Sequence, residues 1–359
     1  MKIALVGPIP PPNGGMAMQT LQLRDLLEQR GHQVTLIAVN PPYWPTWIGH
    51  LPVLRALFRL IPYRQHLSKA LAGHDVVHIM ANSGWAWHLF AAPALRIAAR
   101  CGVPAVVNYR GGLADQFLRK AVGRFKRNLQ YCAALVVPST FLQQVFARYQ
   151  ISSKVVPNII DVQRFQFRPR PLQAPGPHII VARNLEPLYG NHHALHVLAR
   201  LLERHADARL SLAGDGPQRA ELEVLASDLG ISERVHFCGR LDREQMAELY
   251  ASADILLNPT TADNMPNSLL EAMACGVPVV TTDAGGIPHL VEDGRTALMV
   301  AVEDVDAMAT AVQRLLDDPE LSHRLSQAGY AEVQRFTADT VVPQWEQLYH
   351  QVSGGNAHA

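Results

Sequence analysis

Two acidic residues, Asp263 and Glu271, bracket a polar loop and the first turn of a predicted helix. An apolar strand is expected to end at Asn258, and the helix is expected to begin at Pro266 or Asn267, because proline is tolerated in a first helical turn. The free N–H groups of a helix N-terminus attract an anion, whereas a carboxylate beside them suits the hydroxyls of a sugar or a ribose. Phosphate and sugar together indicate a nucleotide sugar as the ligand.

The same helix is expected to stop at Cys275-Gly276, and a short buried strand follows around Val279 and Val280. Gly285 and Gly286 then allow the backbone to come close to another group. The alternative for this stretch is a buried amphipathic helix in an α/β core, with Glu271 on its solvent side.

The spacing Asp263-x7-Glu271, followed by LLEAMACGVPVV and GGIP, resembles the donor-binding core of the family 4 retaining glycosyltransferases. That resemblance implies the GT-B fold, an α/β architecture of two Rossmann-like domains facing a central cleft, with a C-terminal helix crossing back to the first domain. It covers essentially the whole chain, is strongest over 178–300 and is weak over 40–130.

With 359 residues, the chain has room for about two domains. We expect an acceptor-side Rossmann-like domain at 1–170 and a nucleotide-sugar-binding one at 171–340. Residues 341–359 then form the returning helix and a flexible tail. The proline-rich segment 168–177 is a stiff linker.

The net charge of +1 conceals a charge split, because residues 1–170 sum to +15 and residues 171–359 to −14. Such asymmetry indicates a basic domain facing an acidic partner or a membrane. The segment 43–70 combines Trp44 and Trp47 with basic residues at 55, 59, 64 and 69. It is either an interfacial amphipathic helix or a helix packed on its own domain. No nucleic-acid-binding module is recognisable, so nucleic acid is not an expected partner.

In the first half, Gly14 and Gly15 follow a buried strand and open a helix, as in a Rossmann-like unit. The resemblance places them against the donor phosphates, and a plain tight turn is the alternative. Arg110 follows the strand Val103–Asn108, where it is expected either to grip a phosphate or to form a surface salt bridge.

In the second half, the resemblance assigns Arg183 to the donor diphosphate, but Tyr189 stands where the family has a lysine. It implies catalytic roles for Arg183, Asp263, Glu271 and Arg110. It also implies nucleotide-binding roles for Gly214, Gly216, Arg240, Leu241, Asn264, Met265, Pro266 and Asn267.

No run of 18 uncharged apolar residues is present, and the N-terminus favours a strand over a signal peptide. Cys101, Cys132, Cys238 and Cys275 are expected to be core thiols, which favours a cytoplasmic protein. Within the cytoplasm, we expect the protein to associate peripherally with the inner face of the membrane. The triplet Asp304-Val305-Asp306 predicts a helix start and no metal site.

The resemblance implies a retaining glycosyltransferase, and the features above predict that it needs neither a metal nor a cofactor. It would use a nucleoside-diphosphate sugar and a glycan or lipid-linked acceptor in cell-surface polysaccharide or glycoconjugate synthesis. Two alternatives stay open. One is a GT-B sugar-nucleotide epimerase. The other is a catalytically silent subunit that binds nucleotide sugar or membrane. Three departures from the family pattern keep it open: Met80 in place of a histidine, Tyr189 in place of the lysine, and His289 in place of a glutamate.

Overall fold

The computed structural model describes residues 1–10, 15–40, 52–169 and 176–354, with only the backbone described for 52–59. The described chain divides into two compact units, Met1–Ile159 with the chain from Ala338 on, and Ile160–Thr337. The first boundary therefore lies at 159/160, earlier than the expected 170. Phe165 explains the difference, since it packs against Tyr250 of the second unit with ring centroids 5.8 Å apart.

The first unit is built on a parallel sheet that has six strands in the described residues, in the order β2-β1-β3-β4-β5-β6. Strands buried on both faces read as continuous apolar runs, and this is why the Val- and Ile-rich segments form them. The strands are β1 (Lys2–Gly7), β2 (Gln33–Ala38), β3 (Val76–Ala81), β4 (Ala105–Tyr109), β5 (Ala134–Val137) and β6 (Lys154–Val155).

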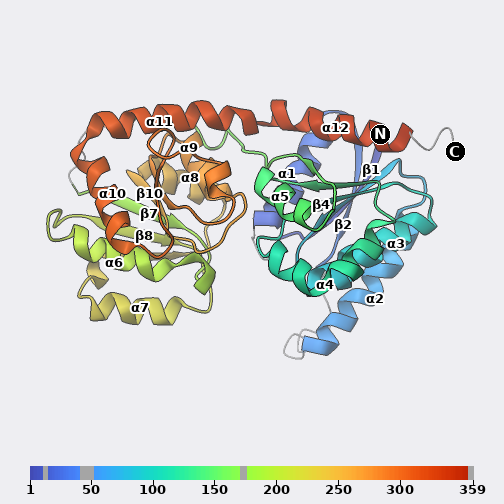
Figure 1. The fold of residues 1–359 in the computed structure, drawn as a ribbon, viewed down its shortest axis with the longest axis horizontal. Helices are drawn as coiled ribbons and strands as arrows, with labels where there is room; N and C mark the ends of the chain where they lie inside the picture. The colour runs from blue at the N-terminus through green and yellow to red at the C-terminus, as the bar shows by residue number, and fades with distance from the viewer. Residues whose placement is uncertain (11–14, 41–51, 170–175, 355–359) are drawn as a thin grey trace. The chain divides into compact units, whose positions relative to one another are not determined.

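Helices cover both faces of this sheet. The core on one face includes α2 (Pro52–Ala70), α3 (Ala92–Arg100), α4 (Ala114–Leu129) and α5 (Thr140–Arg148). The core on the other face includes α1 (Gly15–Gln29) and α12 (Ala338–Gly354). Figure 1 shows α12, the last helix of the chain, beside α1.

The second unit repeats the architecture, with six parallel strands among the described residues in the order β12-β11-β10-β7-β8-β9. They are β7 (His178–Ala182), β8 (Arg209–Ala213), β9 (Val235–Gly239), β10 (Ile255–Asn258), β11 (Val279–Thr282) and β12 (Leu298–Val300). One face packs on α6 (Asn191–Leu201), α7 (Arg219–Asp228), α10 (Val305–Asp317) and α11 (Pro319–Val333). The other packs on α8 (Arg243–Ser252) and α9 (Asn267–Ala274). The expected α/β fold with two Rossmann-like units is confirmed.

The structure bears on two expectations about single segments, the four cysteines and 43–70. Only Cys275 is buried, whereas Cys101 is exposed and the other two thiols are half-buried, so the expectation of four core thiols was wrong. In the described part of α2, Tyr63 and Leu67 are buried in the core of their own unit. Trp44 and Trp47 lie outside the described residues. None of the described helices is long and apolar enough to cross a membrane.

His78 on β3 joins the sheet of the first unit to α12. Its Nδ1 lies 2.7 Å from the hydroxyl of Tyr349, and its Nε2 lies 3.2 Å from Nδ2 of Asn108. The amide donates to Nε2, so the ring proton sits on Nδ1 and is donated to Tyr349. Burial, reinforced by the charge of Arg110, lowers the pKa of His78 from 6.5 to about 3. His78 is therefore a neutral structural residue.

This buried histidine predicts a pH-dependent stability. An unfolded chain protonates His78 near pH 6.5, whereas the folded protein keeps it neutral down to about pH 3. The contribution is therefore present above pH 6.5 and is lost as the pH falls towards 3, by up to about 1.4 kcal/mol per pH unit. Urea unfolding is expected to show that the stability advantage of wild type over His78→Gln shrinks as the medium is acidified. A constant difference would contradict a neutral buried imidazole.

Candidate functional site

The strand order of the second unit reverses at the centre of its sheet. From β7 the chain moves outward through β8 and β9, and it then returns to the other side of β7 with β10. In open parallel α/β sheets, ligands bind outside the carboxyl ends of the strands at such a switch point. Arg183 directly follows β7, and Asn258 ends β10. The two side chains meet there, with Nε of Arg183 donating to Oδ1 of Asn258 at 2.8 Å.

Arg183 also reaches the first carboxylate of the sequence signature. Its Nη2 lies 2.7 Å from Oδ2 of Asp263, and the two side chains are only 11% and 14% exposed. The pair is an ion pair without hydrogen-bond geometry, and neither atom has another hydrogen-bond partner in the described structure. Two buried, oppositely charged atoms that are not saturated by hydrogen bonds can take new partners from a ligand.

Tyr189 lies where the resemblance puts a lysine, and it contacts Arg183. The guanidinium carbon of Arg183 is 5.3 Å from the centroid of the Tyr189 ring, within the range of a cation–π interaction. Burial raises the pKa of the Tyr189 hydroxyl, and the charge of Arg183 opposes that rise. The chain therefore replaces a second cation by an aromatic ring that packs against the first.

The loop between β10 and α9 is held by close backbone packing. Gly285 has φ +57°, and a Cβ there would lie 2.2 Å from the carbonyl oxygen of Asp263. A Cβ on Gly286 would lie 2.0 Å from the carbonyl oxygen of Asn264. Only glycine permits both the conformation and the approach at Gly285. The predicted close approach of these glycines is thus directed at the loop that carries Asp263.

The loops after β7 and β8 are packed in the same way. A Cβ on Gly214 would lie 2.0 Å from the carbonyl oxygen of Arg183, and one on Gly216 would lie 2.4 Å from that of Leu185. Gly214 also bridges to Gly239, next to the predicted base-pocket residues Arg240 and Leu241. Arg240 is exposed and lies 3.6 Å from Asp215, an ion pair that contributes little at a surface.

Helix α9 begins at Asn267 with Pro266 as its N-cap, as predicted. Asn264 and Met265 are buried before it. The N–H of Asn264 donates to Oδ1 of Asp263 at 2.7 Å, so in this structure that donor is engaged by the signature carboxylate. Sequence reasoning missed Ser268, whose hydroxyl is buried in the first turn of α9 without a hydrogen-bond partner among the described residues.

Glu271 is held by α8. The hydroxyl of Tyr250 donates to Oε2 of Glu271 at 2.9 Å. Burial raises the pKa of Glu271, while this hydrogen bond and the charges of Arg243 and Arg183 act in the opposite direction. Tyr250 and Asn258 were also missed, because no local sequence signal marks a residue that supports a site from a different element.

The predicted residues of the first unit form a separate set. Arg110 follows β4 and donates a hydrogen bond to Oδ1 of Asn158, and burial lowers its pKa to about 10. The contact with Asn158 is half-buried, and no salt bridge of Arg110 is found among the described residues. Gly15 is the first residue of α1, whereas Gly14 lies outside the described residues.

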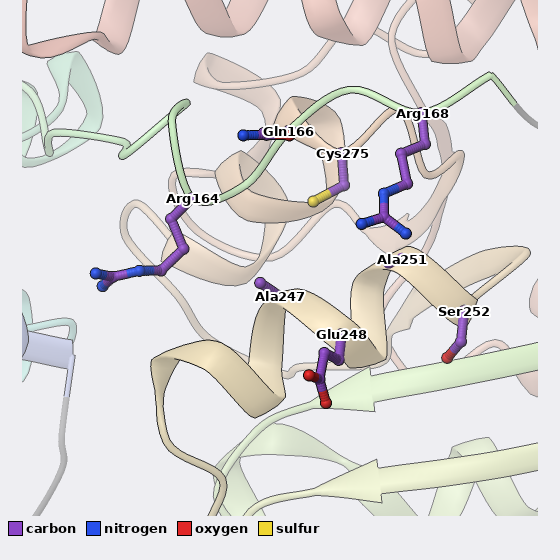
Figure 2. A pocket seen from close by; sticks show the side chains of 8 residues that line it. All are labelled: Arg164, Gln166, Arg168, Ala247, Glu248, Ala251, Ser252 and Cys275. Carbon is purple, nitrogen blue, oxygen red and sulfur yellow. The ribbon is translucent and has the colours of Figure 1, made fainter.

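A further pocket of about 370 Å³ lies in the second unit, between α8 and the segment 164–168. Figure 2 shows Arg168 and Cys275 above α8 and Glu248 on that helix. None of the predicted site residues lines this pocket. In the described parts of the chain, no three His, Cys, Asp or Glu side chains are grouped so that they could hold a metal. Asp304 is the N-cap of α10, its carboxylate accepting from the N–H of Ala307 at 2.8 Å, as predicted.

Comparison with known families gives two adjoining matches. Residues 13–164 match the family described as Glycosyltransferase Family 4. Residues 162–332 match the family described as Glycosyl transferases group 1. The second match contains the whole site built around Arg183, Asp263 and Glu271.

Individual relatives match over part of their length. The chain is 34% identical over 225 residues to the MMP alpha-(1->4)-mannosyltransferase of Mycolicibacterium hassiacum, covering 60% of this chain and 53% of the relative. It is 37% identical over 147 residues to the N-acetyl-alpha-D-glucosaminyl L-malate synthase of Bacillus anthracis, covering 41% and 38%. The chain spans about half or less of the length of the curated relatives it matches first.

A solved structure shares the whole fold. Anabaena HepE in complex with UDP superposes with a TM-score of 0.74 at 20% identity, covering 97% of this chain and 99% of that one. At this level of identity the likeness shows the fold alone.

Proposed function

We propose that this chain, which belongs to the family 4 glycosyltransferases, transfers a sugar from a nucleoside-diphosphate sugar to a glycan or lipid-linked acceptor. The transfer would retain the anomeric configuration and serve the synthesis of cell-surface polysaccharide or glycoconjugate. One observation carries the proposal. At the switch point of the second unit, the Arg183–Asp263 ion pair is buried without saturating hydrogen bonds, and Asp263 lies on the same loop–helix segment as Glu271.

The charges at this site suit the parts of such a donor. Arg183 would hold the diphosphate with the partial positive charge at the α9 N-terminus. Asp263 would accept hydrogen bonds from sugar hydroxyls, and Glu271 from the ribose hydroxyls. When the donor binds, the ion pair between Arg183 and Asp263 would be replaced by two new contacts, Arg183 with the diphosphate and Asp263 with the sugar. Neither side chain would need to move far.

The rate would come from positioning and from stabilising the departing diphosphate. Arg183 would perform that second task, and its guanidinium is held by Asn258 and by the Tyr189 ring. A front-face transfer, with the leaving phosphate accepting the proton of the acceptor hydroxyl, needs no further base from the protein.

A panel of sugar nucleotides separates this proposal from its two alternatives. Uridine donors come first, since the HepE structure contains UDP. A transferase is expected to release nucleoside diphosphate slowly even with water as acceptor, and NMR of the transfer product is expected to show the donor's anomeric configuration. An epimerase would interconvert the sugars, and a silent subunit would do neither.

Metal independence is a prediction of the same proposal. The diphosphate charge would be balanced by Arg183 and by the α9 N-terminus, so no divalent cation is required at this site. Donor hydrolysis is expected to persist after dialysis against EDTA. Loss of activity that only Mg²⁺ or Mn²⁺ restores would contradict this assignment of the diphosphate site.

The basic first unit is proposed to dock on the anionic inner face of the membrane, where a lipid-linked acceptor would be found. Exposed basic side chains gather on α4, among them Lys120, Lys126 and Arg127. Each basic residue near an anionic surface contributes about 1 kcal/mol. Wild type is therefore expected to sediment with phosphatidylglycerol vesicles and only weakly with phosphatidylcholine vesicles.

Replacing Lys120, Lys126 and Arg127 together by Ser is expected to weaken this binding by on the order of a hundredfold at low salt. The matched control replaces three exposed arginines of the second unit, Arg200, Arg204 and Arg234, by Ser. Equal losses in both variants would show a general charge effect. Wild type that ignores anionic vesicles at low salt would overturn the docking proposal.

A further inference from the structure

Trp85 is an exposed tryptophan in a chain that buries others of its kind. Its side chain is 78% exposed, whereas Trp87 and Trp345 lie in the core. An indole carries one of the largest apolar surfaces of any side chain, and leaving it in water forgoes the free energy of burial. Trp85 is the first residue of the helical stretch after β3, so its exposed indole has a defined position and is open to a ligand.

The position of Trp85 is that of a ligand site. It follows β3, and the strand order of the first unit reverses between β1 and β3. Ligands of open α/β sheets bind outside the carboxyl ends at such a switch point. A turn of π-helix, Trp87–Ala91, begins two residues later, and such turns occur frequently at functional sites.

Among the described side chains, the indole has one aromatic neighbour, His88, which is itself backed by a second ring. Its ring lies 6.4 Å from that of His88, edge to face, and His88 lies 5.7 Å from Phe117 on α4 in the same arrangement. The loop before it packs tightly on the loop after β4, since a Cβ on Gly111 would lie 2.3 Å from Oγ of Ser83. Ser83 is fixed in turn by the Tyr109 hydroxyl at 2.7 Å. These contacts fix the position of Trp85, so its exposed ring can serve as a stacking surface.

The surroundings favour a sugar ring over a bilayer. A pyranose has one face of C–H groups, which packs on the electron-rich face of an indole, and a rim of hydroxyls that needs polar neighbours. Asn82 and Ser83 precede Trp85 in the chain, and Asn82 is an exposed polar residue. Among the large apolar side chains that the structure describes as exposed, only Leu113 lies on the neighbouring loop. One indole and one leucine make a small apolar surface for membrane insertion.

We propose that Trp85 is an acceptor subsite, on which a pyranose ring of the acceptor stacks. This inference rests on the proposed function, since it takes the ligand of the first unit to be the acceptor. It narrows the acceptor class of the proposed function, because a stacked pyranose requires the acceptor to carry a sugar ring and not only a lipid phosphate.

Saturation-transfer NMR with simple methyl pyranosides of glucose, galactose, mannose and N-acetylglucosamine tests the subsite without a known acceptor. At least one pyranoside is expected to receive magnetisation from the wild-type protein, strongest at the ring protons of one face. Trp85→Ala is expected to weaken binding about tenfold, and Trp85→Tyr to keep most of it, since a smaller aromatic face remains. Mannitol, with similar hydroxyls and no ring, is expected to give no signal.

The matched control is Tyr131→Ala, which removes another exposed aromatic of the same unit and is expected to change nothing. The subsite is overturned if no pyranoside binds, if Trp85→Ala binds as wild type does, or if Trp85→Ala instead loses binding to phosphatidylglycerol vesicles. Donor hydrolysis by the wild type is measured alongside. Pyranoside binding without hydrolysis would overturn the proposed function alone, and hydrolysis without pyranoside binding would overturn only the subsite.

Discussion

Glu271→Ala is expected to lower donor turnover by roughly tenfold to 150-fold, because a hydrogen bond to a charged group contributes about 1.5–3 kcal/mol. Glu271 would supply that bond to the ribose of the donor. Folding is expected to survive, since the Tyr250 hydroxyl that donates to Glu271 also lies 3.3 Å from the carbonyl oxygen of Ser268. Steady-state hydrolysis and thermal unfolding of the purified variant check both parts.

Three controls sharpen the result. Glu271→Gln keeps the volume and removes the charge, so it is expected to fall between wild type and Ala. Tyr250→Phe removes only the supporting hydroxyl and is expected to have a smaller effect. Glu248→Ala removes an exposed carboxylate from α8 and is expected to behave as wild type. Near-normal kinetics of a well-folded Glu271→Ala protein would refute the assignment.

Arg183→Ala is expected to weaken nucleoside-diphosphate binding by at least about 30-fold, since removing one partner of a buried charged pair costs about 2–5 kcal/mol. Part of that loss would come from Asp263, which would keep its buried charge without the cation now 2.7 Å away. Calorimetry with the nucleoside diphosphate measures the loss directly. Arg183→Lys is expected to recover only part, because a lysine cannot donate to Asn258 and reach Asp263 in the same geometry.

Tyr189→Lys is the informative companion variant. It restores the cation that the family places there but removes the ring that lies 5.3 Å from the Arg183 guanidinium. Nucleoside-diphosphate binding is expected to be kept or tightened, because the added charge faces the same anion. Normal binding by Arg183→Ala, in contrast, would mean that the phosphates bind elsewhere.

Much of the fold was predictable because its signals are local. Continuous apolar runs gave the strands, and the glycine after Cys275 gave the end of α9. The spacing of Asp263 and Glu271 predicted the candidate site, because the loop and the first helical turn between these residues lie at one edge of a sheet. Chain order and switch-point topology then bring Arg183 to the same edge.

What the sequence could not provide depends on contacts between distant segments. Tyr250 supports Glu271 from another helix, and Asn258 fixes Arg183 across the sheet. In the sequence, Tyr189 in place of the family's lysine indicates only a lost positive charge. The structure shows in addition that its ring packs against Arg183. Cys101 is the C-cap of α3 and is exposed there, a position that its residue type alone does not indicate.

Hydrogen–deuterium exchange with and without the tightest-binding nucleoside diphosphate tests the central claim most directly. Slower exchange is expected in three segments of the second unit, around Arg183, around Gly214 and across 263–271. No change is expected at the pocket between α8 and 164–168. Protection confined to that pocket or to the first unit, with 263–271 exchanging as before, would contradict the account.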